Sequence, residues 1–317
     1  CLIEMVSFPS PVSKLYFRWA RGLEKHGDKI IQLTREDDYK SVYADCYYQT
    51  NERKQKFFTG KRAETQGQYF DFILDSKKPF IVSESNPFRQ YDGWLRFGWN
   101  SYKWTKGNFN NDNVDDTRWK RFQNITGVTF NDWHSPGDDI IIMGQKEGDS
   151  ALNELYEQGF NSFYDWVNVV IKNIRKHTDR RIVIRPHPRN LDKTLIQVRS
   201  KVLKNNKKNN VVLSKHLTQG GNQGGAGLDA DLNNAHCVVS FNSLSSVEAV
   251  CKGIPVFSLN DGSMTYPISH KSLSQIENIN YDIDRTQWQN QIAYTMWNKV
   301  DVISGECWEH LKPVYFS

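Results

Sequence analysis

The sequence predicts an α/β protein built on parallel sheets, and three stretches of the chain carry that prediction. Residues 237–259 pass from a short apolar run through a serine-rich turn and a short helix to a second apolar run. Residues 181–189 contain an apolar run of three residues and end in Arg-Pro-His-Pro-Arg. Residues 2–33 follow the order strand, loop, helix, glycine, strand. Short apolar runs separated by helices are typical of strands buried on both faces of a parallel sheet.

The chain opens with a predicted strand over residues 2–6, a helix over 12–25 and a second strand over 29–33. Gly27 ends the helix, because glycine tolerates the backbone conformation that stops one. No Gly-x-Gly-x-x-Gly motif follows the first strand, which argues against NAD or FAD. A basic stripe with helical spacing comprises Lys14, Arg18, Arg21 and Lys25. This stripe either contacts a polyanion such as nucleic acid or is an ordinary solvated face.

Two carboxylates in the first half of the chain are candidate general bases. Residues 80–83 form a predicted strand, and Glu84 follows it directly. A carboxylate at a strand end can take the proton of an acceptor hydroxyl. Asp45, at the start of the aromatic and basic stretch 45–62, is the second candidate, and Arg89 is a candidate ligand for phosphate or acceptor. For each of these residues a structural salt bridge remains an open alternative.

Residues 91–104 interleave aromatic side chains with lysine, arginine and asparagine. Such a surface stacks on bases or sugars, so Trp94 and Trp99 are candidate acceptor-binding residues. A helix is predicted over residues 117–125, and residues 132–138, which contain Ser-Pro-Gly, are predicted to be an interdomain linker.

The second half of the chain holds a series of buried strands whose ends carry polar side chains. The predicted strands cover residues 139–143, 182–184, 211–214 and 237–240. Gln145 and Lys146 follow the first of them and can contact a donor diphosphate or sugar. His187 lies between Arg185 and Arg189 at the carboxyl end of another strand, where open sheets bind ligands. This grouping suits a phosphate or diphosphate, and a plain surface turn with solvated arginines is the alternative.

The start of the predicted helix 247–251 is a second candidate anion site. Its free backbone N–H groups and the positive end of its dipole attract negative charge. Glu248, in the first turn, can reach a ribose or sugar hydroxyl. The residues able to cap this helix are Asn242, Ser243, Ser245 and Ser246. A well-capped crossover helix without a ligand is the alternative.

The Arg-Pro-His-Pro turn and the later run Ser-Phe-Asn-Ser-Leu-Ser-Ser-Val-Glu-Ala-Val-Cys-Lys-Gly-Ile-Pro-Val resemble capsule-polysaccharide-type glycosyltransferases. Polymer-forming glycerophosphotransferases and sialyl- or Kdo-type transferases are similar. The resemblance covers residues 139–260 and implies a GT-B fold, in which two Rossmann-like domains hold the active site in the cleft between them. It implies that His187 contacts the donor phosphates and that Glu248 binds a donor hydroxyl. The residues implied to line the phosphate site are Ser243, Ser245 and Ser246.

The resemblance also sets the expected domains and chemistry. Residues 1–135 are the expected N-terminal, acceptor-binding Rossmann-like domain, and 136–285 the nucleotide-sugar-binding domain. Residues 286–317 are expected to be helices that pack back on the first domain. The implied reaction is displacement at the anomeric carbon of a nucleotide-sugar, with a UDP-sugar favoured. Cationic and hydrogen-bonding side chains would stabilise the leaving diphosphate, so Mg²⁺ is an optional helper and no obligatory metal is predicted.

One acidic pair has the spacing of a metal motif. Asp229 and Asp231 fall on a predicted helix start, where helix capping explains both.

The acceptor is suggested by a second resemblance. The motif Phe-Gly-Trp-Asn-Ser-Tyr-Lys-Trp and the asparagine-, lysine- and tryptophan-rich composition resemble proteins of tailed bacteriophages, some of which glycosylate hydroxymethylcytosine in their own DNA. Such an enzyme binds duplex DNA and flips the target base, and Lys14 and Arg18 would contact it. A net charge of +5 is low for a DNA-binding protein. A glycan or lipid-linked acceptor, and a non-catalytic nucleotide-binding module, stay open as alternatives.

Length and composition bound the remaining possibilities. A chain of 317 residues allows two domains of ordinary size. The five cysteines are odd in number and irregularly spaced, which argues against disulfides or zinc and favours a reducing cytoplasm, that of an infected bacterium if a phage encodes the chain. No apolar run approaches the ~20 residues that span a membrane. A monomer or weak homodimer is expected.

Overall fold

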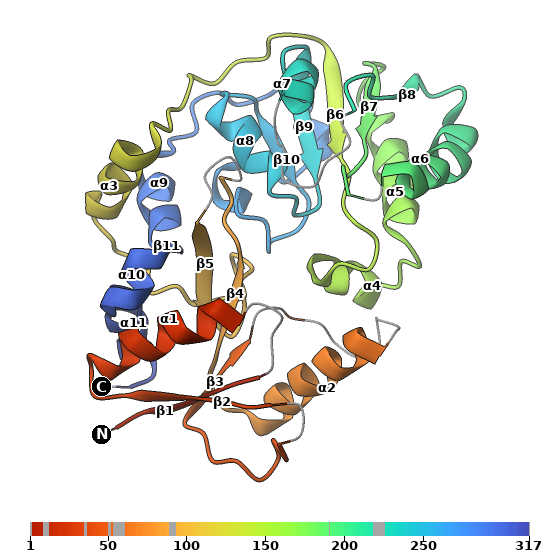
Figure 1. Ribbon diagram of the computed structural model, residues 1–317. Coiled ribbons are helices and arrows are strands. Elements are labelled where there is room, and N and C mark those ends of the chain that lie inside the picture. The colour runs from red at the N-terminus through yellow and green to blue at the C-terminus, as the bar shows by residue number, and fades with distance from the viewer. Residues whose placement is uncertain are drawn as a thin grey trace. The chain divides into compact units, whose positions relative to one another are not determined.

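Figure 1 shows the computed structural model, which describes residues 2–8, 13–34, 37–49, 52, 61–88, 93–189, 191–217 and 226–316. Contacts within the chain define two units. Unit 1 contains residues 1–86, 92–119 and 289–317, and unit 2 contains residues 87–91 and 120–288. The stretch predicted as a linker, residues 132–138, therefore lies inside unit 2. Each unit holds a mainly or wholly parallel sheet with helices, so the predicted α/β class is confirmed.

Unit 1 is built on a six-stranded sheet with the strand order β11-β5-β4-β3-β1-β2. Its strands are β1 (Glu4–Ser7), β2 (Lys29–Gln32), β3 (Cys46–Gln49), β4 (Phe80–Ser85), β5 (Trp94–Trp99) and β11 (Met296–Asn298). Strands β1 to β4 pair in parallel, whereas β5 runs antiparallel to both β4 and β11. Strand β11 consequently runs in the same direction as β1 to β4.

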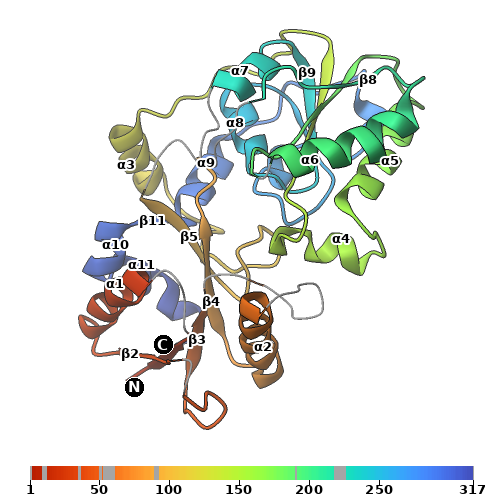
Figure 2. The same ribbon diagram turned by 45° about the vertical axis from the view of Figure 1, so that its right-hand side comes forward.

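Side chains of alternating residues in the unit 1 strands point into two separate hydrophobic cores, as expected for strands covered on both faces. Met5 and Tyr48 point to one core, which includes residues of α1 (Ser13–Glu24), α10 (Lys299–Ser304) and α11 (Glu306–Leu311). Their neighbours Val6 and Tyr47 point to the other core, which includes residues of α2 (Lys61–Ser76). Figures 1 and 2 both show α1 beside α10 and α11, with α2 on the other side of the sheet.

Three strands of unit 1 differ from the sequence-based expectation. The aromatic stretch expected to face a ligand forms β5, whose burial pattern shows five of six residues buried. The stretch 45–62 contributes β3, in which all four residues are buried. Residues 286–317 are expected to be helices, but there α9 (Thr286–Ala293) is followed by β11. The secondary structure of these segments depends on pairing with neighbouring strands and on burial of large aromatic rings. Local sequence propensity reports neither of these.

Unit 2 is built on a five-stranded sheet in the order β10-β9-β6-β7-β8, and every neighbouring pair is parallel. Its strands are β6 (Asp139–Met143), β7 (Ile182–Arg185), β8 (Val211–Leu213), β9 (Ala235–Ser240) and β10 (Val256–Ser258). Because all five run in one direction, their carboxyl ends share one edge of the sheet.

Helices cover both faces of the unit 2 sheet. Ile140 and Cys237 share a core with α5 (Phe163–Ile174), while Ile141 and Val238, on the opposite face, are also fully buried. Figure 1 shows α5 and α6 (Leu191–Gln197) beside β7 and β8, and α7 (Ala226–Leu232) and α8 (Ser245–Cys251) beside β9 and β10. Helix α6 has a π-helical continuation (Val198–Leu203), and the remaining helices are α3 (Thr117–Thr126) and α4 (Asn153–Glu157).

Candidate functional site

The carboxyl edge of the unit 2 sheet gathers most of the residues predicted to bind a donor. Residues 144–149 follow β6, residues 186–189 follow β7, and residues 241–244 follow β9. Ligands of open parallel sheets bind outside the carboxyl ends of the strands. The structure therefore brings the predicted residues of these three loops to one edge of one sheet.

Buried amide side chains tie the ends of β6, β9 and β10 together. The side-chain N–H of Gln145 donates to Oδ1 of Asn242 at 2.6 Å, and the Asn242 backbone N–H donates to Oε1 of Gln145 at 3.2 Å. Asn242 in turn donates to Oδ1 of Asn260 at 3.4 Å, and Asn260 donates to Glu154 at 2.7 Å. All three amide side chains belong to buried residues, so this chain of hydrogen bonds fixes the relative positions of the strand ends.

Asn260 and Glu154 extend this network beyond the residues that the sequence predicts. Asn260 stands two positions after the last residue of β10, in Ser258-Leu-Asn260, and Asn242 has the same relation to β9, in Ser240-Phe-Asn242. The repeated Ser-x-Asn at two neighbouring strand ends is the sequence signal that identifies Asn260. Glu154 has no comparable signal, because only the fold brings α4 to this edge.

Gly144 brings the loop after β6 into contact with the Arg-Pro-His-Pro turn. Its backbone N–H donates to the carbonyl of Arg185 at 2.7 Å. A Cβ atom at this position would lie 2.6 Å from that carbonyl oxygen and 2.8 Å from the backbone nitrogen of His187. Both neighbours are backbone atoms, which cannot rotate away as a side chain would. Glycine is therefore required for the two loops to pack this closely.

Gly144→Ala is expected to lower the free energy of unfolding by about 1–3 kcal/mol, the usual cost of overpacking, and to displace the turn that carries His187. Urea denaturation measures the first effect, and titration with UDP measures the second. Gly148→Ala is the matched control in the same loop, because no atom lies within 4 Å of the added methyl group. Gly148 has a positive φ of 71°, so alanine at this position is expected to lower the free energy of unfolding without displacing the turn that carries His187. If Gly144→Ala binds UDP as tightly as the unchanged protein, the contact at Gly144 is not needed for the donor site.

His187 is held by its own turn. Its Nδ1 accepts a hydrogen bond from the backbone N–H of Arg189 at 3.1 Å. An accepting Nδ1 fixes the neutral tautomer with its proton on Nε2. The side chain of His187 is half-buried, whereas Arg189 is exposed. The turn thus fixes the His187 ring at the carboxyl end of β7.

Arg185 is committed to neighbouring elements of unit 2. Its guanidinium forms a salt bridge with Asp231 and donates to the carbonyls of Gly227 at 2.9 Å and His216 at 3.1 Å. Ser214 also donates to Asp231, at 2.7 Å. Asp231 lies inside α7 and is buried, so the expectation that it caps a helix start is wrong. A role of Arg185 in phosphate binding stays a prediction.

Lys146 stands in a loop that its neighbours hold in place. Glu147 accepts from the backbone N–H of Phe163 at 2.6 Å and from the hydroxyl of Tyr156 at 2.9 Å. The hydroxyl of Tyr156 accepts from the backbone N–H of Gly148 at 3.1 Å, and burial raises the pKa of this phenol. Lys146 itself is half-buried, and its ammonium has no hydrogen bond or ion pair with any residue that the structure describes. The loop that carries this cation is therefore held at the carboxyl edge of the sheet.

The start of α8 differs from the capped helix that the sequence predicts. The N-cap residue is Leu244, and no side chain caps this helix. Ser246 is fully buried, donates to the carbonyl of Ser243 at 2.6 Å and accepts from Thr265 at 3.0 Å. It belongs to a buried hydroxyl cluster that also includes Ser258 and Ser263. This burial removes Ser246 from the candidate ligand-binding residues.

Three further predicted donor residues lie near the same helix. The backbone N–H of Ser243 donates to Oγ of Ser240 at 2.9 Å, and Ser245 is the first residue of α8. Ser243, Ser245 and Glu248 are all half-buried. Burial, and then the charge of Glu248, raise the pKa of Cys251 to about 12. The roles of Ser243, Ser245 and Glu248 in donor binding stay predictions.

The two candidate bases in unit 1 lie at different edges of its sheet. Asp45 precedes β3, accepts the backbone N–H of Glu4 at 2.8 Å and accepts the hydroxyl of Tyr43 at 2.5 Å. It lies at the amino end of its strand, opposite to the edge at which open parallel sheets bind ligands. Glu84 lies inside β4, near the carboxyl end, opposite Arg96 in the β5 register, and its Oε1 accepts the backbone N–H of Ser85 at 2.7 Å. Its role as the base stays a prediction.

The predicted acceptor-binding tryptophans belong to the core of unit 1. Trp94 is buried, and Trp99 is fully buried. The indole N–H of Trp99 donates to the carbonyl of Leu311 at 2.7 Å, and its ring contacts those of Trp308 and Tyr315. The expectation that Trp94 and Trp99 stack on an acceptor is therefore wrong, because their ring faces are covered. Arg89 and the side chain of Lys14 lie outside the described residues, and Arg18 is half-exposed on α1.

Within the described ranges, no group of three or more His, Cys, Asp or Glu side chains is placed to hold a metal ion. None of the helices in these ranges combines the length and apolar character that crossing a bilayer requires.

The chain is similar in fold to solved structures. No protein-family model matches it, and no curated protein matches its sequence. KpsC from Thermosulfurimonas dismutans, a beta Kdo 2,7 transferase, aligns with a TM-score of 0.53 at 12% identity, over 96% of this chain and 98% of that one. UDP-bound MnaA from S. aureus aligns with a TM-score of 0.33 at 11% identity, over 98% and 96% of the two chains. The KpsC alignment, together with the two sheets and their order, shows that the chain has a GT-B-type fold, as predicted.

Proposed function

We propose that the chain is a glycosyltransferase that moves a sugar from a nucleotide-activated donor, favouring a UDP-sugar, to a hydroxyl acceptor. The observation that carries the proposal is the contact at Gly144, which places the Lys146 loop beside the turn of His187 at the carboxyl edge of the unit 2 sheet. A lysine and a histidine in these two loops, at the carboxyl edge of the sheet, suit the phosphates of a donor. The likeness in fold to a Kdo transferase supports the same reaction class.

The reaction would be a displacement at the anomeric carbon of the donor sugar. The bond from that carbon to the diphosphate oxygen breaks, and its electron pair leaves with the nucleoside diphosphate. The acceptor oxygen bonds to the anomeric carbon and gives its proton to a base, for which Glu84 is the proposed residue. Lys146 and His187 would stabilise the charge that develops on the leaving diphosphate. Mg²⁺ would be an optional helper, because these side chains supply positive charge and a hydrogen-bond donor.

The acceptor we propose is 5-hydroxymethylcytosine in duplex DNA. The resemblance of residues 97–104 to phage proteins supports it. A saccharide acceptor of the capsule type is the second candidate. It is favoured by the alignment with KpsC, whose described activity is transfer of Kdo.

Intact-mass spectrometry tests the proposal directly. A duplex containing hydroxymethylcytosine is incubated with the protein and a panel of UDP-, CMP- and GDP-sugars, with and without Mg²⁺. The expected result is a gain of one pentose or hexose residue with a UDP-sugar, and its retention without added metal. Lys146→Ala is expected to reduce the gain, whereas Lys172→Ala, which removes an exposed lysine from α5, is expected to leave it unchanged.

Two other outcomes lead to different conclusions. If one nucleotide stabilises the protein thermally but the duplex gains no mass, the proposed donor site stands. The proposed acceptor is then a saccharide and not DNA. Absence of any thermal response to all three nucleotide-sugar classes would overturn the glycosyltransferase proposal.

A further inference from the structure

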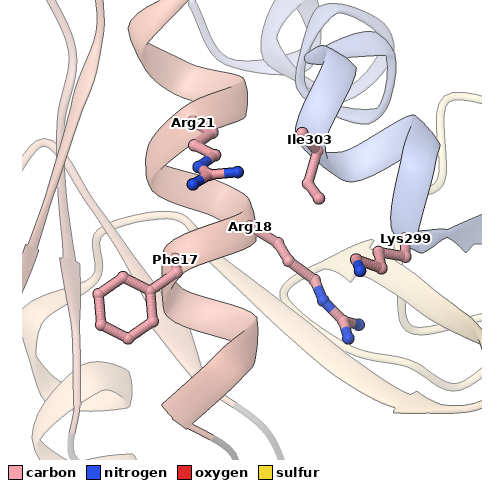
Figure 3. Close-up of a pocket in the computed structure, with 5 residues that line it drawn as sticks. All are labelled: Phe17, Arg18, Arg21, Lys299 and Ile303. Carbon is pink, nitrogen blue, oxygen red and sulfur yellow. The ribbon is translucent and has the colours of Figure 1, made fainter.

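A hollow of about 240 Å³ lies in unit 1 between α1 and α10 (Figure 3). The described residues that line it are Phe17, Arg18 and Arg21 from α1 and Lys299 and Ile303 from α10. Three of these five side chains are cationic and two are apolar. The sequence predicts the basic residues of α1 as a stripe on one helix, but Lys299 joins them only because the fold brings α10 beside α1.

Two glycines set the spacing of the helices that form this hollow. A Cβ atom on Gly22 would lie 2.2 Å from the backbone oxygen of Val302, and one on Gly305 would lie 2.9 Å from the backbone oxygen of Gly22. The helix backbones therefore meet at Gly22. Arg18 precedes this contact by one turn on α1, and Lys299 precedes it on α10. Figure 3 shows the Arg18 side chain reaching from α1 toward Lys299.

The hollow runs along α10 and the middle of α1, and Lys299 is its lining residue at a helix start. Helix α1 follows β1, and α10 follows β11, which runs in the same direction as β1. Both helices consequently begin at the carboxyl edge of the sheet, and Lys299 is the first residue of α10. This is the edge at which open α/β sheets bind their ligands.

The three cations of the hollow have no counter-charge within the described part of the chain. Arg18, Arg21 and Lys299 form no salt bridge or side-chain hydrogen bond with any described residue, and no acidic side chain is among the described lining residues. Asp301, the acidic residue of α10, is fully buried and pairs with Arg118 instead. Like charges gathered in one hollow repel each other, and a bound anion relieves that repulsion.

We infer that this hollow binds the phosphate group of a small organic phosphate ester. Arginine presents a planar fork that matches phosphate oxygens, and lysine adds a point charge. Phe17, which is 61% exposed, and the half-buried Ile303 provide apolar surface beside the cations. The volume of 240 Å³ exceeds that of a phosphate ion, which leaves room for the organic part of the ester. This inference does not depend on the proposed glycosyl transfer, because the hollow lies within unit 1 and needs no donor.

Isothermal titration with phenyl phosphate and with inorganic phosphate tests the inference on the full chain. Phenyl phosphate is expected to bind more tightly than inorganic phosphate, and rising salt is expected to weaken both. Arg18→Gln, which keeps much of the side-chain stem, and Lys299→Ala are each expected to weaken phenyl phosphate binding about tenfold, the scale of one charge-assisted hydrogen bond. Ile303→Ala is expected to reduce the preference for phenyl phosphate and to leave inorganic phosphate unaffected.

Lys207→Ala is the matched control, since it removes an exposed lysine from unit 2. Equal binding by Arg18→Gln, Lys299→Ala and this control would overturn the inference, and so would equal affinity for the two phosphates. A DNA duplex that binds through Arg18 and Lys299 while phenyl phosphate does not would also overturn it, in favour of a nucleic-acid surface.

Vesicles that contain phosphatidic acid distinguish the source of the ester. Cosedimentation that Arg18→Gln abolishes would support the inference with a lipid headgroup as the ligand. Binding of phenyl phosphate without cosedimentation would support it with a soluble ester as the ligand.

Discussion

Replacing Arg118 with alanine is expected to lower the free energy of unfolding by about 3–5 kcal/mol, the usual cost of breaking a buried ion pair from one side. Arg118 is buried, and its guanidinium donates to Asp301 at 3.0 Å, to Glu306 at 2.6 Å and to the carbonyl of Met296 at 2.7 Å. Its guanidinium carbon also lies 3.6 Å from the ring centre of Trp297. Alanine would leave the fully buried Asp301 without its cation.

Urea denaturation followed by tryptophan fluorescence measures this loss, because most tryptophans of the chain lie in unit 1. Arg118→Lys retains the positive charge but lacks the planar guanidinium that bonds several acceptors at once. We therefore expect a loss of unfolding free energy between that of Arg118→Ala and that of the unchanged protein. Arg199→Ala removes an exposed arginine from unit 2 and is expected to change stability by no more than about 0.5 kcal/mol. If Arg118→Ala is as stable as Arg199→Ala, the segment 289–317 is not anchored through Arg118.

Replacing His187 with alanine is expected to reduce sugar transfer at least ~10²-fold, the scale of a lost charge-stabilising contact. The expectation rests on the tautomer, since Nδ1 accepts the Arg189 backbone N–H and the ring proton stays on Nε2. The initial rate of sugar transfer measures the effect, with donor affinity measured separately.

Two variants separate contact with the donor from support of the turn. His187→Asn retains an acceptor oxygen near the position of Nδ1 but lacks Nε2, so we expect it to be as impaired as His187→Ala. Recovery of activity in His187→Asn would instead assign His187 to holding the turn. His177→Ala replaces an exposed histidine of unit 2 and is expected to retain full activity.

Unit 2 follows closely from its sequence, for a physical reason. Its strands are buried on both faces and consist of short apolar runs, such as residues 139–143, that stand out from polar loops. Parallel order then sends the residue after each strand to one edge. Gln145, His187 and Asn242 consequently reach that edge as expected. The hydrogen bonds that link Gln145, Asn242 and Asn260 depend on the three-dimensional packing.

Unit 1 follows from its sequence only in part, because its core is aromatic and mixed with polar residues. Strand β5 carries Arg96 and glycine among its rings, so its pattern is that of a surface. The fold buries Arg96 and pairs its guanidinium with the carbonyls of Ser85 and Tyr102. Strand β11 has only three residues, and no local signal separates it from the helices around it. Both segments form strands because they pair with strands that are distant in the sequence.

The edge strand β11 also constrains the order in which the chain can fold during synthesis. Unit 2 draws nearly all of its residues from 120–288, so it can form as soon as that stretch has left the ribosome. Unit 1 needs residues 296–311 for its last strand and for α10 and α11, although its first strands are made much earlier. Until then β5 has an unpaired edge, which is a template for aggregation. The first unit to begin emerging is therefore the last to be completed.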